Sequence, residues 1–358
     1  MDVARKGEFE KIIAAATAAP SGDNSQPWSF IVRGNVIEFH YRPELDHPVL
    51  NYEEGGTLIA LGAALENAAL EARALGFKPS IAYQEGGPCV AKMMLIAGGS
   101  LDAADVPLHA ALEKRHSNRK AYKKAPLAAE HRAAIIDPRH IADGLALSLV
   151  EDPGAMAKVS RALTTMEETA LGNQRLHELF FADILWSDED NAKGKTGLHI
   201  KTLELPPPAR AMFRLIKHWP VAKFLGRIGF PTKVAETNAA QNASAAAFGV
   251  ISAARPDRAA YLDVGRTLER VWLVATARGL ALQIVTGLTF LARAIEHDPS
   301  VAALFDDEER ARVRHAYATI REAAGGAGEP ILAFRIGESD PPTLITARRA
   351  SEVRFASG

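Results

Sequence analysis

The stretch Pro20-Ser21-Gly22-Asp23-Asn24-Ser25-Gln26-Pro27-Trp28 separates an alanine-rich segment of helical periodicity from a strand-like run at 30–32. Its two prolines, its glycine and its short polar side chains cannot continue a helix, so the backbone must leave the helix here. The resulting loop offers open N–H groups and small donors, which can hold a planar, polar ligand. It can also be an ordinary helix-to-strand turn, because clusters of Gly, Pro, Asn and Ser mark turns in many proteins.

The patterns on both sides of this loop predict an ordered helix and strand unit. Apolar residues recur at helical spacing from 8 to 19, and Gly34-Asn35 separates two strand-like runs as a hairpin turn does. A second helix is expected over 56–76, with small residues that let another helix approach closely. Strands are expected at 80–83 and 90–96.

Composition limits the classes of partner and compartment. The chain has 358 residues, a net charge of -1 and a pI near 6.9, which gives no broad attraction for nucleic acid or an anionic membrane. A single cysteine, Cys89, excludes an intrachain disulfide and fits a reducing compartment. Neither a signal peptide nor an uninterrupted apolar span is evident. We therefore expect a soluble, cytoplasmic protein without a nucleic-acid or membrane partner.

An internal repeat indicates two related halves. Residues 61–77 align without a gap on 264–280, with identical Gly, Leu, Glu, Leu, Ala, Ala and Gly, and a strand pattern follows each copy. The second part also begins with expected helices at 108–112 and 130–136, a strand at 145–150 and a helical stretch from 155 to about 186. The prediction is an α+β fold of two halves, 1–107 and 108–358, packed through helices around Leu65 and Leu268.

A stretch without counterpart in the first half runs from about 183 to 237. It contains Pro206-Pro207-Pro208 and is then rich in apolar and aromatic residues between Met212 and Leu225. A long insertion of this kind can be a lid over a site or an additional packing element. The sequence leaves both interpretations open.

A second polar cluster lies at the start of the C-terminal half. Arg115, His116, Ser117 and Arg119 place several anion-compatible donors within five positions. Arginine forks, a hydroxyl and free backbone N–H groups suit phosphate oxygens, although such a cluster can also form a solvated surface. Motifs of other enzyme classes are not present. The run 194–196 resembles the end of a P-loop, but Glu189 occupies the position where that motif requires glycine. The sequence contains no HExxH, GxSxG or GxGxxG motif.

Taken together, these motifs resemble those of the FMN-dependent nitroreductase family. The loop at 20–28 resembles its flavin-binding loop, and Lys-Arg-His-Ser-Asn-Arg at 114–119 resembles its Arg-x-Ser-x-Arg/Lys phosphate motif. The segment 279–288 looks like the one that passes the reactive edge of the flavin, and 341–349 looks like the family's basic tail. The resemblance implies a nitroreductase-like fold, in the fused two-half, Acg-like branch, as a single-chain pseudo-dimer.

The resemblance also implies the residues of a cofactor site. Ser21, Gly22 and Asn24 would clamp the flavin, Arg115, Ser117 and a tail arginine would hold the phosphate, Arg119 would lie near flavin N1 and the C2 oxygen, and an N–H near Thr286 or Gly287 would face N5. The expected cofactor-binding set is Pro20, Ser21, Gly22, Asn24, Arg115, His116, Ser117, Arg119, Thr286, Gly287, Arg348 and Arg349. No catalytic side chain and no metal are expected, because the flavin carries the electron chemistry.

The implied function is that of an FMN-dependent NAD(P)H oxidoreductase. NAD(P)H would donate hydride to flavin N5, and a nitroaromatic or quinone-like small-molecule acceptor would then be reduced. In the family each flavin lies between two subunits; here one complete site would be shared by both halves of a monomeric pseudo-dimer or homo-oligomer. The alternative is an FMN-binding storage or sensor protein with a covered flavin and little or no turnover. A structural protein that lost the cofactor is a third possibility.

Overall fold

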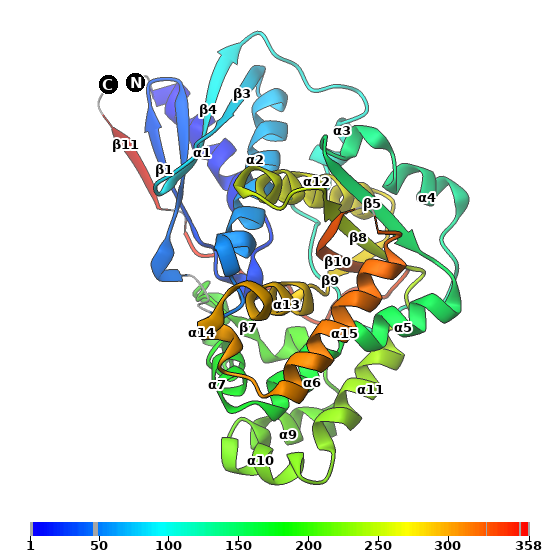
Figure 1. Cartoon of the computed structure of the whole chain (residues 1–358). Helices are drawn as coiled ribbons and strands as arrows, with labels where there is room; N and C mark the ends of the chain where they lie inside the picture. Colours follow the sequence, from blue (N-terminus) through cyan, green and yellow to red (C-terminus); the bar gives the residue numbers. More distant parts are fainter. Residues whose placement is uncertain (1–2, 46–48, 327, 351, 357–358) are drawn as a thin grey trace.

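Two central helices pack against each other between two separate sheets (Figure 1). The computed structural model describes residues 3–45, 49–326, 328–350 and 352–356. The central helices are α2 (Gly55–Ala74) and α12 (Arg258–Ala277), and most of their side chains are buried. The chain therefore has the mixed helix and strand content that was predicted, with the repeat segments at its centre.

The first sheet contains the hairpin that follows the 20–28 loop. Its strands are β1 (Trp28–Arg33), β2 (Val36–Tyr41), β3 (Phe77–Tyr83), β4 (Cys89–Ala97) and β11 (Val353–Ala356), in the order β11-β1-β2-β4-β3. Arg33 pairs with Val36 across the turn, so the predicted hairpin is confirmed. The alternate residues Trp28, Phe30 and Val32 are buried, which fixes the register because a slip of one residue would expose them.

The second sheet repeats this arrangement. Its strands are β5 (Leu145–Val150), β8 (Ala247–Ala253), β9 (Ala281–Ile284) and β10 (Glu329–Gly337), in the order β5-β8-β10-β9. When β11 is set aside, the first sheet has the order β1-β2-β4-β3, which corresponds to β5-β8-β10-β9. Each central helix follows the second of these strands, β2 or β8, and precedes the last, β3 or β9. All neighbouring pairs among these eight strands are antiparallel.

Two glycines allow the central helices to cross at very close range. A Cβ atom on Gly62 would lie 2.0 Å from the carbonyl oxygen of Leu262, and one on Gly265 would lie 2.0 Å from that of Ile59. Backbone therefore meets backbone at the crossing, an approach that no residue larger than glycine permits.

The end of the chain returns to the first half. Strand β11 pairs in parallel with β1, with Val353 beside Phe30. The N-terminal sheet consequently includes a strand from the far end of the sequence, coloured red beside blue in Figure 1. On its way the tail passes the 20–28 loop. This crossing ties the two halves together.

The remaining helices surround the sheets and build the insertion. They are α1 (Val3–Thr17), α3 (Val106–His109), α4 (Ala129–Ile135), α5 (Pro153–Leu163), α6 (Thr165–Gly172), α7 (Gln174–Ala182), α8 (Asp188–Ala192), α9 (Pro207–Ile216), α10 (Trp219–Gly226), α11 (Phe230–Asn242), α13 (Gly287–His297), α14 (Pro299–Ala302) and α15 (Asp307–Ala323). Two short strands, β6 (Ile184–Leu185) and β7 (Leu198–His199), pair in parallel.

The prediction of a single helical stretch from 155 to about 186 was wrong, because the helix is interrupted. The segment forms three helices, α5, α6 and α7, and β6 follows. Asn173 adopts an extended backbone, and its side-chain oxygen accepts hydrogen bonds from the N–H groups of Arg175 and Leu176. An asparagine in this role starts a new helix rather than continuing the old one.

The insertion has its own small core at one end of the molecule. Its buried members are Leu171, Phe181, Ile184, Ile200, Ile216 and Ala222. Phe213 and Trp219 pack against this core. Part of the stretch between Met212 and Leu225 therefore packs inward, and its other apolar residues, among them Leu215 and Phe224, are exposed.

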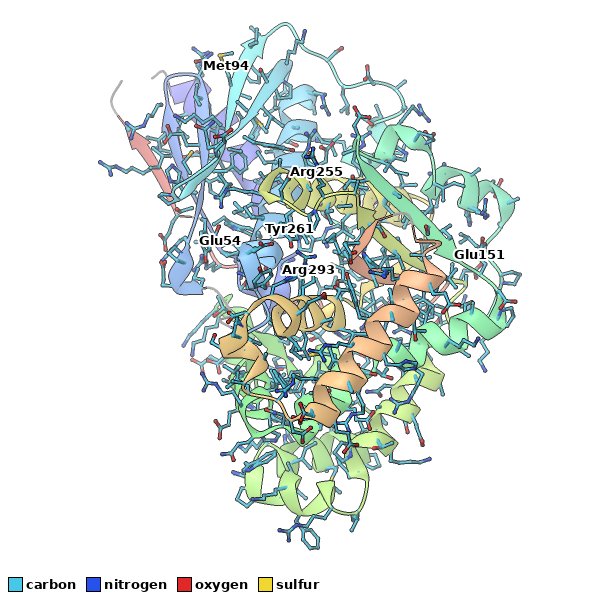
Figure 2. All side chains as sticks on the ribbon, viewed as in Figure 1. Glu54, Met94, Glu151, Arg255, Tyr261 and Arg293 are labelled. Carbon is cyan, nitrogen blue, oxygen red and sulfur yellow. The ribbon has the colours of Figure 1, made fainter. Side chains whose placement is uncertain are left out.

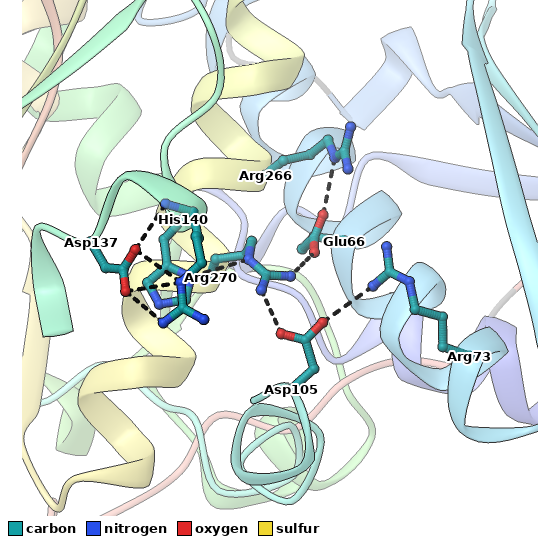
Figure 3. A network of polar contacts seen from close by, with 8 residues as sticks. Glu66, Arg73, Asp105, Asp137, His140, Arg266 and Arg270 are labelled. Atoms are coloured by element: carbon teal, nitrogen blue, oxygen red, sulfur yellow. Dashed lines mark hydrogen bonds and ion pairs between the residues drawn. The ribbon is translucent and has the colours of Figure 1, made fainter. Parts of the chain in front are cut away.

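A buried ion-pair network joins the two central helices (Figure 3). Glu66 of α2 is within 3.0 Å of Arg266 and 2.8 Å of Arg270 on α12, and Arg270 also lies 2.6 Å from Asp105. Burial alone raises the pKa of Glu66, yet the two arginines hold that pKa below its ordinary value. The charge of Glu66 is therefore retained inside the interface.

Within the described ranges, no helix combines the length and apolarity that crossing a bilayer requires.

Candidate functional site

A cavity of about 450 Å³ opens between the two halves. Its walls come from the 20–28 loop, the start of α2, the basic cluster, the insertion and the junction of β9 with α13. The lining residues are Pro20, Ser21, Gly22, Asp23, Ser25, Glu44, Leu45, Leu50, Asn51, Gly56, Thr57, Ile59, Ala60, Ser117, Arg119, Asp183, Thr196, Gly197, Leu268, Ile284, Thr286, Gly287, Phe290 and Leu332. The volume is in the range of small-molecule and cofactor sites.

The loop on one wall has a strained backbone. Asp23, Asn24 and Gln26 have φ of 45°, 56° and 51°, the left-handed region that side chains other than glycine avoid. The cost is roughly 1–2 kcal/mol for a residue such as Gln26 and is smaller for Asp and Asn, which adopt this conformation more readily. The Gln26 N–H donates to the Ser21 hydroxyl at 3.0 Å, which closes the loop on itself. A strained conformation that is held in place beside a cavity is typical of a binding site.

The C-terminal tail holds this loop from behind. The guanidinium of Arg348 donates to the side-chain oxygen of Asn24 at 2.7 Å and to the carbonyl of Ala19 at 3.2 Å. Arg349 donates its backbone N–H to the Gln26 side chain at 2.9 Å and its guanidinium to the Gln26 carbonyl at 2.6 Å. Loop and tail are separated by more than 300 positions, and their contact compensates for the strain of the loop.

Arg115, from the other half, binds the backbone just before this loop. It is 6% exposed, donates to the carbonyl of Ala18, lies 2.9 Å from the buried carboxylate of Glu269 and stacks over the ring of Trp272 at 4.6 Å. Burial and, after it, the neighbouring charge of Arg115 lower the pKa of Arg348, and Glu269 offsets part of the effect, so that the pKa is about 10. Two buried guanidinium groups face one buried carboxylate, so positive charge is in excess beneath the loop.

Ser117 and Arg119 form the opposite wall. Ser117 forms a bridge with Leu282 of β9, and the neighbouring Asn118 N–H donates to the Leu282 carbonyl at 3.1 Å, so the segment is fixed to the second sheet. Arg119 donates to the carbonyl of Thr202 at 3.5 Å, a long hydrogen bond. Burial lowers the pKa of Arg119, and Asp23 offsets part of this.

The positive charge of Arg119 at the cavity is therefore only weakly neutralised by neighbouring carboxylates. Within the described residues no carboxylate lies within 4.0 Å of its guanidinium. An anionic group in the cavity would restore the electrostatic stabilisation that burial removes. Asp23, Glu44 and Asp183 line the same cavity as Arg119, and Glu44 is paired with Arg42.

The third wall is the start of α13. The Thr286 hydroxyl donates to the carbonyl of Ile331 at 3.2 Å and fixes the turn that precedes the helix. Gly287, the first residue of α13, packs so tightly that a Cβ would lie 2.9 Å from the side chain of Met166. The first N–H groups of a helix have no partner within the helix and carry partial positive charge. This turn therefore presents donors at the cavity.

The cavity brings together seven of the residues predicted from the sequence. They are Pro20, Ser21, Gly22, Ser117, Arg119, Thr286 and Gly287. Four others do not line the cavity. Asn24 belongs to the loop and binds the tail, Arg348 and Arg349 of the tail bind the loop, and Arg115 binds the carbonyl of Ala18 just before it. His116 is half-buried and is not part of the lining. The direct contact of all twelve residues with FMN stays a prediction.

Sequence reasoning missed two parts of the wall. Gly56, Thr57, Ile59 and Ala60 line the cavity because α2 begins there, and the small residues at this start were a signal only for helix packing. Asp183, Thr196 and Gly197 bring both ends of the insertion's first segment to the rim. No local pattern in the sequence distinguishes these three residues from other loop residues.

One group of potential metal ligands lies elsewhere, on β2 and β4. Ligand atoms of Glu38, His40 and Cys89 are within 4.8 Å of one another. The carboxylate of Glu38 also lies 3.6 Å from Arg33 and 3.4 Å from Lys92. These cations compete with a metal ion, so we interpret the group as part of an ion-pair network.

Comparison with known proteins gives distant matches. No protein-family model matches the chain. A curated protein from Mycobacterium tuberculosis (strain CDC 1551 / Oshkosh), the uncharacterized protein MT1398, is 23% identical over 347 residues, covering 95% of this chain and 47% of the relative. The chain thus spans about half the length of this relative.

Two solved structures are similar at low TM-scores. A nitroreductase with bound FMN from Bacteroides fragilis NCTC 9343 is 14% identical with a TM-score of 0.36, over 68% of this chain and 94% of that one. The FMN-dependent nitroreductase NfnB from Mycobacterium smegmatis, in complex with NADPH, is 15% identical with a TM-score of 0.35, over 67% and 90%. Structural likeness at this level fixes neither the cofactor nor the reaction of the present chain.

Proposed function

We propose that this chain binds FMN in the cavity between its halves and acts as an FMN-dependent NAD(P)H oxidoreductase. The observation that carries the proposal is the meeting, at one cavity, of the 20–28 loop with Ser117 and Arg119 and with the Thr286-Gly287 turn. These three segments lie far apart in the sequence, and each was expected at a flavin from its own motif. Their shared wall supports a common ligand.

The chemistry of the lining fits this cofactor. Ile59, Leu268 and Phe290 offer apolar surface for a planar ring system. Ser117, Arg119 and the N–H groups at the start of α13 offer donors for its polar edge and for an anion. The excess positive charge of Arg115 and Arg348 beneath the loop adds a favourable field for a phosphate, although these side chains bind the loop itself.

The roles of the residues follow from their places. Pro20, Ser21 and Gly22 would hold the cofactor from the first half. Ser117 and Arg119 would hold it from the second, and the Arg119 charge would stabilise an anionic reduced form. When bound, FMN would supply hydride transfer from NAD(P)H and reduction of a nitroaromatic or quinone-like acceptor. No side chain is required as a nucleophile or metal ligand.

We further propose that the chain is a fused pseudo-dimer with one complete site. The matching orders β1-β2-β4-β3 and β5-β8-β10-β9, with β11 set aside, and the paired glycines of α2 and α12 support related halves. Their boundary at 107/108 is part of this proposal. Glu66 and Glu269 occupy equivalent positions but have different partners. Glu66 forms ion pairs with Arg266 and Arg270. Glu269 forms an ion pair with Arg115 below the loop. This difference supports a site on one side only.

A second candidate function is storage or sensing of FMN with little turnover. It is supported by Asp183, Thr196 and Gly197 of the insertion, which line the cavity and so bring the insertion against its contents. Residues of α9 and α10 do not line the cavity, so the aromatic stretch that first suggested a lid does not contribute to this argument.

Anaerobic mixing of the FMN-loaded protein with NADH or NADPH tests the proposal. Rapid bleaching of the flavin absorbance, followed by recovery on adding a quinone or nitroaromatic compound, is the result expected for the oxidoreductase. Steady-state kinetics should show alternating binding of donor and acceptor. A flavin that stays oxidised under both donors would favour storage or sensing, and a ternary complex would contradict the alternating scheme.

A further inference from the structure

We propose that the outer face of α9, α10 and the turn after α10 is a docking surface for an anionic lipid membrane. The proposal concerns the part of the insertion that does not line the cavity. It is independent of the proposed flavin chemistry.

The first observation is a marked separation of charge. The whole chain is nearly balanced, with 42 Lys and Arg against 43 Asp and Glu. Residues 205–235, however, contain six Lys or Arg and no Asp or Glu; the basic residues are Arg210, Arg214, Lys217, Lys223, Arg227 and Lys233. The nearly neutral net charge, from which we expected no membrane partner, therefore includes one segment of the chain that is strongly basic. Each such cation strengthens binding to an anionic leaflet about five-fold.

The second observation is that this surface leaves large apolar side chains in solvent. Leu215 is 56% exposed, Phe224 62% and Ile228 71%, with Met212 and Val221 at 38% each. These are five of the ten large apolar side chains that are exposed among the described residues, within 17 consecutive positions. Isolated exposed apolar residues are ordinary, but a cluster at the tip of an element marks an interaction site.

The third observation is that the basic side chains are free to bind. Arg214, Lys217, Lys223 and Arg227 are exposed, and none forms an ion pair in the part of the chain that the structure describes. Lys217 lies over the ring of Trp186, 5.1 Å from its centre, and leaves its charge at the surface. Their arrangement is not explained by neutralisation within the molecule.

The fold supports these helices as a rigid tip. Ile216 and Ala222 anchor α9 and α10 in the insertion's own core, so the exposed residues on the other side are not needed for packing. In Figure 1 both helices lie at the end of the molecule opposite the N-terminal sheet, and in Figure 2 side chains project from this end. A tip of this shape can reach a flat surface.

The presence of both basic and exposed apolar residues favours a lipid membrane over nucleic acid or a protein as the partner. Cations without apolar residues would suit nucleic acid, whose phosphates provide essentially all of the non-specific attraction. Apolar residues without cations would suit a protein partner. A helix pair with exposed Phe, Leu and Ile flanked by Arg and Lys matches the interfacial zone of an anionic bilayer, where apolar side chains enter the acyl boundary and the cations contact headgroups.

Vesicle sedimentation of the full chain tests the proposal. We expect binding to vesicles that contain phosphatidylserine and little binding to vesicles of phosphatidylcholine alone. Joint replacement Phe224→Ser and Ile228→Ser should weaken binding at least ten-fold. Joint replacement Arg214→Gln, Lys223→Gln and Arg227→Gln should weaken it by roughly 100-fold, from about five-fold per charge.

The matched control is Met94→Ser, an exposed apolar residue on β4 at the other end of the molecule (Figure 2). It should leave vesicle binding unchanged, and circular dichroism should show all variants folded because the altered side chains are exposed. Three results would overturn the proposal: no binding to anionic vesicles, binding to DNA or heparin that ignores Phe224 and Ile228, or self-association through this face without vesicle binding.

Discussion

Gly62 and Gly265 occupy interchangeable places in the crossing of α2 and α12. Gly62 faces the carbonyl of Leu262, and Gly265 faces that of Ile59. Positions 62 and 265 differ by 203, and so do 59 and 262, which is also the offset of the sequence repeat. The contact of Gly62 with Leu262 and the contact of Gly265 with Ile59 are therefore equivalent under the repeat. A local two-fold relation of this kind is what the fusion of two similar units would leave.

Replacing Gly62 by alanine should strongly destabilise the chain. The new methyl group would begin 2.0 Å from the Leu262 oxygen, so the central helices must move apart. We expect a loss of about 3 kcal/mol in the free energy of unfolding, as for severe overpacking. Chemical denaturation measures it. Gly7→Ala in α1 is the control, because its Cβ has no neighbour within 4 Å and should slightly stabilise the helix. Equal stability of the two variants would contradict the tight crossing.

Two substitutions at Asn24 distinguish the energetic cost of the loop's backbone conformation from the contribution of its hydrogen bond to Arg348. Asn24→Gly and Asn24→Ala both remove the acceptor of Arg348, but only glycine tolerates φ of 56° without cost. The glycine variant should therefore be more stable than the alanine variant by roughly 1 kcal/mol. Thermal unfolding of the pair measures the difference. The reverse order of stability would mean that the loop does not keep this backbone in solution.

The network around Glu66 predicts a dependence of stability on pH. Its pKa is held below the ordinary value of 4.5 by Arg266 and Arg270, so the folded state favours the charged form. This contribution is present above pH 4.5 and is lost as the pH falls through the lowered pKa of the folded state. Glu66→Gln should cost roughly 3–5 kcal/mol at neutral pH because it leaves buried arginines uncompensated.

The same variant should also flatten the acid limb of the stability curve, measured by denaturant unfolding at a series of pH values. The control is Glu10→Gln, whose partner Lys6 and carboxylate are both about half exposed, and it should change stability little. If Glu66→Gln kept the acid limb of the unaltered protein, the ionisation of Glu66 would not contribute to it.

Arg348 should affect the cofactor site through the loop rather than by direct contact. Arg348→Lys removes the forked donor that holds Asn24 and Ala19 together while it keeps a positive charge. We expect about ten-fold weaker FMN binding and faster proteolysis within 20–28. Unchanged proteolysis together with weaker binding would favour the direct phosphate contact that the sequence resemblance implied.

Local patterns predicted the elements that have a strong period or a defined turn. The hairpin at Gly34-Asn35, the two central helices and the strand after each were correct because buried faces and turn residues are encoded within short windows. The helix breaks at Thr164 and Asn173 were missed, because the capping by Asn173 competes with a helical apolar pattern that continues past it.

Relations between distant segments could be predicted only through the family resemblance. That resemblance brought the loop and the basic motif to one cavity, and Ser117 and Arg119 do line it with Ser21 and Gly22. It implied a phosphate contact for Arg115 and for a tail arginine, Arg348, Arg349 or both, and this contact stays a prediction. In the structure these side chains bind the carbonyls of Ala18, Ala19 and Gln26, and Arg115 also pairs with Glu269. A guanidinium suits both kinds of acceptor, and the sequence contains no information on which one lies nearer.

The central claim is one FMN per chain, held between the halves with Arg119 at the cavity. Titration of the flavin-free protein with FMN, followed by flavin fluorescence, tests it most directly. The account predicts a stoichiometry of one, a loss of affinity of about ten-fold or more in Arg119→Ala, from the loss of a charge-assisted hydrogen bond, and unchanged affinity in the exposed neighbour variant Lys114→Ala. No uptake of FMN, two molecules per chain, or equal affinity of Arg119→Ala and the unaltered protein would contradict it.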